Sequence, residues 1–183
     1  MDIIVLLKQV PSTESMIEID GDGVSIKPDG IKWVINPYDE FAVEEALRIR
    51  EAHGGSVTIV SAGREKAAEA IRTALAMGAD KGVLVADLAL ENCDGMGTAT
   101  VLAKAVKDLP HDLIIAGQRA VDDDNFLVGA AVAEKLGMPL ISMVFKEEVK
   151  DGQITCHKTV DGGSVVVEAA LPVLFTTCLL YTS

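Results

Sequence analysis

The feature that most constrains the fold is an alternation between short apolar runs and longer amphipathic segments that end at glycine. The short runs have the length of β-strands, and the segments between them have the length of α-helices. Such an alternation forms right-handed βαβ units and predicts an α/β fold, a doubly wound parallel sheet with helices on both faces. The predicted strands span residues 3–7, 57–60, 83–85 and 113–116, and the predicted helices span residues 37–53, 64–77, 95–108 and 125–136.

The first predicted helix has a strong start signal. Asn36 stands in the N-cap position, Pro37 in the first helical position, and Asp39 and Glu40 in the first turn. We therefore expect Asn36 to cap the helix. Its replacement by alanine should cost about 1 kcal/mol and harm folding more than ligand affinity.

The pattern changes in the last quarter of the chain. Strands at residues 141–149, 153–160 and 164–169 are joined by Asp-Gly turns and predict an antiparallel extension, and residues 172–177 predict the last strand. A glycine-marked hairpin is also expected at residues 16–26.

The antiparallel extension should have little to pack against. We expect its apolar side chains to be exposed and to promote self-association of the isolated chain. These side chains are Val144, Phe145, Val165, Val166 and Val167.

Charge and cysteine content exclude several classes of function. The chain has 16 basic and 28 acidic residues, a net charge of −12, which disfavours binding to nucleic acid or to anionic membrane surfaces. No apolar run has the length needed for insertion into a membrane. Three cysteines without a CxxC motif indicate a reducing compartment, and we expect a cytoplasmic protein.

The candidate site lies at the carboxyl ends of the predicted strands, where open parallel sheets bind ligands. The most informative strand end is residues 117–124, a small and polar loop that leads into a helix N-terminus whose free amides can hold a phosphate. Alternatively, Asp122, Asp123 and Asp124 only cap that helix. The pattern leaves both interpretations open, and carboxylates near a phosphate should point away from it or bind ribose hydroxyls.

Signals for other chemistries are missing. Gly95-Met96-Gly97 is an incomplete dinucleotide fingerprint, and there is no GxxxxGK[ST] loop for hydrolysis of a nucleoside triphosphate. Cys156 and His157 are adjacent on one strand and point to opposite faces, so they cannot share a metal ion. We therefore expect neither a metal site nor catalytic residues.

Four separated motifs in the right order resemble the β subunit of electron-transfer flavoproteins. They are Lys8-Gln9-Val10-Pro11 and residues 36–47, 72–80 and 117–129, and the resemblance extends to about Thr177. It implies an adenine-nucleotide α-hydrolase-like fold and a heterodimer with an α subunit that carries FAD. Such a heterodimer takes electrons from flavin dehydrogenases, commonly acyl-CoA dehydrogenases, as in fatty acid oxidation, and passes them to a downstream acceptor.

The resemblance also implies the nucleotide contacts, at the same strand ends that the topology selects. They are Leu6, Asn36, Pro37, Tyr38, Asp39, Ala62, Gly117, Gln118, Arg119, Ala120, Val121, Asp122, Asp123, Asp124, Asn125, Phe126, Leu127 and Val128.

The chain departs from the family pattern in two places. Residues 126–128 are apolar where many members are polar, which leaves phosphate contact to backbone amides and to Asn125. Residues 179–183 resemble neither the family's dehydrogenase-recognition loop nor its arm around the α subunit. We interpret residues 1–178 as an incomplete nucleotide-binding domain and residues 179–183 as a non-native tail.

The nature of the nucleotide remains a choice between AMP and, as in electron-bifurcating members, a second FAD. Bifurcating β subunits tend to have Asp-Gly-Asp-Thr where this chain has Asp122-Asp123-Asp124-Asn125, which favours AMP. A stand-alone nucleotide-binding module of the universal-stress type is an alternative from another class. It would have a second glycine three residues after Gly117, where this chain has Ala120.

Overall fold

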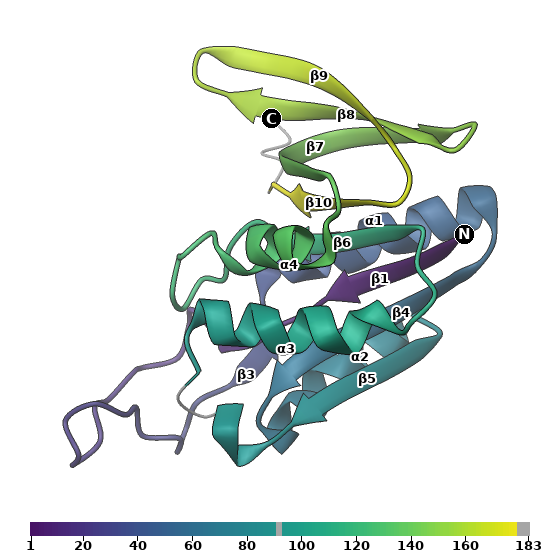
Figure 1. The fold of residues 1–183 in the computed structure, drawn as a ribbon. Helices are drawn as coiled ribbons and strands as arrows, with labels where there is room; N and C mark the ends of the chain where they lie inside the picture. Colours follow the sequence, from purple (N-terminus) through teal and green to yellow (C-terminus); the bar gives the residue numbers. More distant parts are fainter. Residues whose placement is uncertain (91–92, 179–183) are drawn as a thin grey trace.

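A single eight-stranded sheet organises the molecule in the computed structural model, which describes residues 1–90 and 93–178. Its strand order is β5-β4-β1-β6-β10-β7-β8-β9, and all neighbours from β5 to β7 are parallel (Figure 1). The parallel strands are β1 (Asp2–Leu6), β4 (Ser56–Gly63), β5 (Lys81–Ala86), β6 (Leu113–Gly117), β7 (Leu140–Lys150) and β10 (Val173–Thr177). The antiparallel strands are β8 (Gln153–Val160) and β9 (Gly163–Ala170).

Helices cover both faces of the parallel strands, which confirms the predicted fold class. Helices α1 (Pro37–His53) and α2 (Ala68–Met77) share one apolar core with the sheet. Helices α3 (Gly95–Lys107) and α4 (Val128–Leu136) share the core on the other face. Two short 3-10 helices, η1 (Glu65–Ala67) and η2 (Leu88–Leu90), are the other helical elements in the described part of the chain.

Two predicted boundaries differ from the structure. The helix expected from residue 125 begins at Val128, because Asp124 and Phe126 have φ angles of 51° and 56°, which a right-handed helix cannot accommodate. In the predicted hairpin only one isolated bridge forms, between Ile19 and Ile26.

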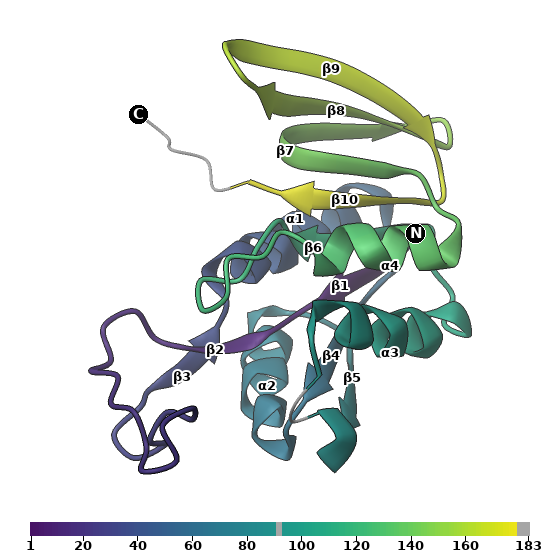
Figure 2. The same cartoon turned by 60° about the vertical axis from the view of Figure 1, so that its left-hand side comes forward.

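The strand pairing lies instead at the base of this segment. Strands β2 (Gln9–Pro11) and β3 (Trp33–Ile35) pair with each other, and residues 12–32 between them project away from the sheet and helices (Figures 1 and 2). We call residues 12–32 the arm.

The last strand determines how the antiparallel extension is attached. β10 returns between β6 and β7 and runs parallel to both. The start of β7 thereby joins the core on the α1 face, so Val144 is buried and its expected exposure is wrong. The expected exposure of Val165 and Val166 on the edge strand β9 is confirmed, whereas Phe145 and Val167 are half-buried.

Within residues 1–90 and 93–178, no helix combines the length and apolarity that a membrane crossing requires. The same residues contain no cluster of three or more His, Cys, Asp or Glu side chains that could hold a metal ion. The predicted tail at residues 179–183 lies outside the described part of the chain.

Candidate functional site

A cleft of about 250 Å³ lies where the carboxyl ends of β1, β4 and β6 meet. Leu6, Ala62 and Gly117 line it together with Asn36, so the predicted convergence of these strand ends is confirmed. The proposed nucleotide contacts that line the cleft are Leu6, Asn36, Asp39, Ala62, Gly117, Gln118, Arg119, Ala120, Asp123, Asn125, Leu127 and Val128. Pro37, Tyr38, Val121, Asp122, Asp124 and Phe126 lie outside this lining.

The carboxylate of Asp39 joins two of these strand ends. Its Oδ2 accepts a hydrogen bond from the Lys8 amide at 2.7 Å, and its Oδ1 accepts one from the Gly117 amide at 3.1 Å. Burial raises the pKa of Asp39 to about 7, although both amide hydrogen bonds act to lower it. Asp39 therefore holds the ends of β1 and β6 against the first turn of α1.

The buried Asp39 carboxylate leaves no room for a side chain at position 117. A Cβ atom at position 117 would overlap Asp39 Oδ1 and lie 2.7 Å from Tyr38 Cβ. Only glycine therefore lets β6 end directly against α1.

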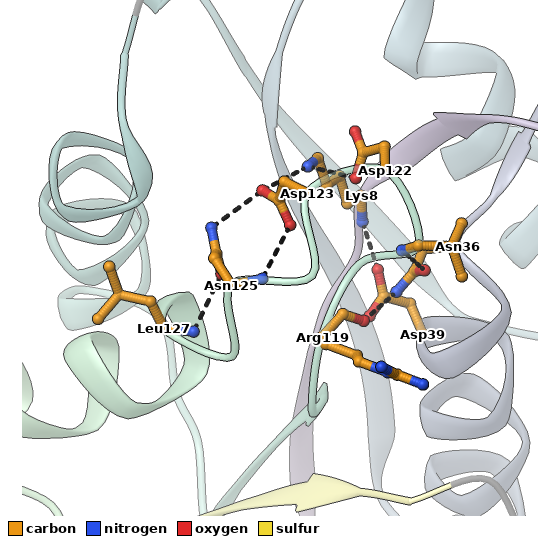
Figure 3. Close-up of polar contacts among 9 residues, drawn as sticks. Lys8, Asn36, Asp39, Arg119, Asp122, Asp123, Asn125 and Leu127 are labelled. Atoms are coloured by element: carbon orange, nitrogen blue, oxygen red, sulfur yellow. Dashed lines mark hydrogen bonds and ion pairs between the residues drawn. The ribbon is translucent and has the colours of Figure 1, made fainter.

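The Asn36 side chain binds the loop after β6 and, among the described residues, makes no capping bond to α1. Its Nδ2 donates to the Arg119 carbonyl at 2.8 Å, and its Oδ1 accepts from the Val121 amide at 3.1 Å (Figure 3). Asn36 occupies the N-cap position of α1 as predicted, and its carbonyl accepts from the amides of Asp39 and Glu40, but among the described contacts its side chain makes no capping hydrogen bond. The Asn36 side chain is buried, and both of its bonds fix residues 119–121 beside the cleft.

The three consecutive carboxylates of this loop are each paired with a cation. Lys8 Nζ lies 2.7 Å from Asp122 Oδ1 and 3.0 Å from Asp123 Oδ2, and Arg119 Nη1 lies 2.7 Å from Asp124 Oδ1. Burial lowers the pKa of Lys8, but the hydrogen bonds and charges of Asp122 and Asp123 outweigh it and raise that pKa overall. This pairing reduces the repulsion that three carboxylates would exert on a phosphate.

Arg119 also contacts two aromatic rings. Its Nε donates to the Tyr38 hydroxyl at 2.7 Å, and its guanidinium carbon lies 5.0 Å from the Tyr38 ring centroid and 5.2 Å from the Phe126 ring centroid. Cation–π contacts with both rings help to hold the guanidinium. Tyr38, Phe126 and Asp124 thus shape the loop from outside the cleft.

Asn125 bonds within the loop. Its Nδ2 donates to Asp123 Oδ2 at 2.9 Å, and its Oδ1 accepts from the Leu127 amide at 3.0 Å (Figure 3). The expected role of Asn125 in phosphate contact stays a prediction, and the structure gives its side chain two other partners. Within the described residues α4 has no side-chain cap, so the amides of its first turn face the loop without an intrahelical acceptor.

Sequence reasoning missed the wall of the cleft that α3 provides. Leu90, Cys93, Gly95, Thr98 and Leu102 line it. The incomplete glycine motif at residues 95–97 was the available signal, because it lies in the connection that leads from β5 through η2 to α3. Asp94 caps this helix, with its Oδ1 accepting from the Gly97 amide at 2.7 Å.

One residue of the cleft has a polar atom without a partner. Gln118 lines the cleft, and its Oε1 is buried without a hydrogen-bond donor among the described residues. A buried acceptor without a donor is destabilising.

Comparison with known proteins gives a consistent result. The family model described as the electron transfer flavoprotein domain matches residues 24–178. The electron transfer flavoprotein subunit beta of Thermoanaerobacterium thermosaccharolyticum is 39% identical over 176 residues, which cover 96% of this chain and 67% of that protein. The subunits of the same name from Clostridium acetobutylicum and Syntrophomonas wolfei are 40% and 42% identical over 176 and 178 residues, and 68% and 69% of their lengths are covered. In both comparisons 96% of this chain is covered. The chain thus spans about two thirds of the length of these relatives.

Proposed function

Because the chain belongs to the electron transfer flavoprotein family, on the branch of its β subunits, we propose that it binds an adenine nucleotide as the non-catalytic subunit of an electron carrier. The partner is an α subunit, which holds most of the contacts to the FAD of the heterodimer. The heterodimer takes electrons from flavin dehydrogenases such as acyl-CoA dehydrogenases and passes them to a downstream acceptor. We expect it to act in the reducing cytoplasm, as three cysteines without a CxxC motif indicate.

The observation that carries the proposal is the cleft at the ends of β1, β4 and β6. It combines an apolar wall with the amides at the N-terminus of α4 and with the buried acceptor Gln118 Oε1. An adenine nucleotide has a matching set of groups: a flat base, hydroxyl and amino donors, and an anionic phosphate.

Different residues of the cleft would contact different parts of the nucleotide. Leu6, Ala62 and Leu102 would contact the base, Gln118 would accept a hydrogen bond from a ligand donor, and the first-turn amides of α4 would hold the phosphate. Asn36 and Asp39 would act indirectly, by positioning the loop and the strand ends. AMP bound in this cleft would have a structural role only, whereas FAD bound there would be a second redox centre.

The sequence of the loop after β6 favours AMP over FAD. Bifurcating β subunits tend to have Asp-Gly-Asp-Thr where this chain has Asp122-Asp123-Asp124-Asn125. The pairing of Asp122, Asp123 and Asp124 with cations also leaves a loop that tolerates a phosphate.

Calorimetric titration of the heterodimer with AMP and with FAD tests this function. We expect saturable binding of AMP and one FAD per heterodimer. Gln118→Leu should weaken AMP binding by about two- to tenfold, the effect of one hydrogen bond, while Gln153→Leu on the exposed start of β8 should leave it unchanged. If neither AMP nor FAD bound to the heterodimer, the proposal would be refuted. Two FAD per heterodimer would identify a bifurcating type.

A further inference from the structure

We propose that Lys8 recognises the phosphate group of the nucleotide, and that Asp123 competes with this phosphate for the Lys8 ammonium group. The inference rests on the proposed function, because that function supplies the nucleotide. It adds a charged side chain to the site, since Lys8 is not among the nucleotide contacts that the resemblance to the family implies.

Two cations line the cleft in the described part of the chain, Lys8 and Arg119. The Arg119 side chain binds Tyr38 and Asp124, which both lie outside the lining. The Lys8 ammonium group binds Asp123, which lines the cleft. Of the two cations, Lys8 is therefore the one whose charged group lies beside another residue of the cleft wall.

The main chain of Lys8 is fixed, whereas its ammonium group keeps one donor for a ligand. The Lys8 amide donates to Asp39 Oδ2 at 2.7 Å, and the Lys8 carbonyl accepts from the Asn36 amide at 2.9 Å. An ammonium group has three N–H donors. Among the described residues two of them are used, by Asp122 at 2.7 Å and by Asp123 at 3.0 Å. The third is available to an anion in the cleft.

Lys8 lies on the side of the cleft where the proposed function places the phosphate. Asp123 Oδ2 accepts from Lys8 Nζ at 3.0 Å and from Asn125 Nδ2 at 2.9 Å (Figure 3). Asn125 Oδ1 in turn accepts from the Leu127 amide at 3.0 Å, directly before α4. All of these residues line the cleft, as does Val128 at the start of α4. The Lys8 charge and the first-turn amides of α4 therefore border the same part of the cleft.

The contact between Lys8 and Asp123 can be exchanged for a contact with a phosphate. The two side chains are each 41% exposed, and exposed ion pairs contribute little to stability because water screens their charges. Asp122 lies outside the cleft lining and can keep its own contact with Lys8 when a ligand enters. The negative charge of Asp123 lies in the lining, so it opposes the phosphate.

Calorimetric titration of the heterodimer with AMP and with adenosine tests the inference, because these ligands differ only in the phosphate group. Lys8→Met should weaken AMP binding by about tenfold, the effect of a hydrogen bond to a charged group, and leave adenosine binding unchanged. Asp123→Asn removes the competing charge and should strengthen AMP binding by about two- to fivefold. The matched control is Lys27→Met on the arm. It removes a lysine that is paired with Glu18 at 2.8 Å outside the cleft, and it should change neither affinity.

The opposite effects of the two cleft variants distinguish phosphate recognition from a purely structural role. If the ion pair only stabilised the loop, its loss would weaken AMP binding in both variants. The inference would be overturned if Lys8→Met weakened the binding of AMP and of adenosine equally, or if Asp123→Asn weakened the binding of AMP. A wild-type heterodimer that binds neither AMP nor FAD would instead refute the proposed function.

Discussion

The parallel half of the sheet and its antiparallel extension differ in what surrounds them. Strands β1, β4 and β6 are covered on both faces by helices, and their ends form the cleft. Strands β8 and β9 lie at the edge of the sheet, and β9 exposes most of its side chains. The comparison shows that a site needs strand ends fixed from both sides.

The two regions differ because their backbone N–H and C=O groups have different hydrogen-bond partners. In the parallel half β1 and β6 end beside the first turn of α1, and the amides at a helix start have no intrahelical acceptor. Asp39 accepts two amides at these strand ends, and the start of α4 leaves others for a ligand. In β7–β9 the antiparallel ladder pairs the strands with one another, and β9 at the edge presents an exposed surface.

The largest expected difference between the two regions is in packing. Phe175 on β10 is fully buried where the extension joins the parallel half, so Phe175→Ala should reduce the free energy of unfolding by about 3–5 kcal/mol. Val166→Ala on exposed β9 should change it by less than about 0.5 kcal/mol. Urea unfolding of both variants measures the contrast, and equal losses would show that the extension is as tightly packed as the core.

Two glycine substitutions, at Gly117 and at Gly163, test how tightly the residues around the cleft are packed. Gly117→Ala should destabilise the protein by about 1–3 kcal/mol and weaken nucleotide binding, because the added methyl group overlaps the Asp39 carboxylate. Gly163→Ala on β9 meets no atom within 4 Å and should be nearly neutral. Melting temperature and AMP titration report both effects, and a neutral Gly117→Ala would contradict the tight junction of β6 with α1.

The clamp of the cleft loop is tested at Asn36. Asn36→Ala leaves the Arg119 carbonyl and the Val121 amide without their partner, which should cost about 1–3 kcal/mol and weaken AMP binding as well. A true N-cap serves as the comparison: Asp94→Ala should cost about 1 kcal/mol. If Asn36→Ala lost stability but kept its full affinity for AMP, the loop would not depend on the clamp.

The response to pH joins the two regions. Burial, then the hydrogen bond and charge of Glu45 on α1, raise the pKa of Glu147 on β7 to about 8, and burial raises that of Asp39 to about 7. The folded protein keeps these protons where unfolded carboxyl groups, with a pKa of about 4, release them. The free energy of unfolding should therefore fall as the pH rises from about 4 to about 8.

A variant separates the contribution of the extension to this response. Glu147→Gln keeps the shape of the side chain without its charge, so it should flatten the upper part of the pH profile and leave the part due to Asp39. Urea midpoints between pH 5 and pH 9 measure both profiles. An unchanged slope in Glu147→Gln would show that the carboxyl pair does not connect the extension to α1.

Much of the fold follows from local sequence. The apolar runs and glycine stops predicted the strands and helices, and the topology of parallel sheets predicted that Leu6, Ala62 and Gly117 meet. The start of α4 was predicted three residues too early, because nothing in the composition of the loop required positive φ angles at Asp124 and Phe126.

The sequence by itself determined the fold class, the edge of the sheet that carries the cleft and the family of the chain. These depend on hydrophobic periodicity, helix boundaries and ordered motifs, which are readable within short windows. Only the tertiary structure decided which side chains meet there. The bonds of Asp39 to Lys8, of Asn36 to Arg119 and of Lys8 to Asp122 join residues 31, 83 and 114 positions apart. An asparagine before a helix has the same local signature whether it caps that helix or binds a distant loop. Its partner is chosen by the packing of β6 beside α1.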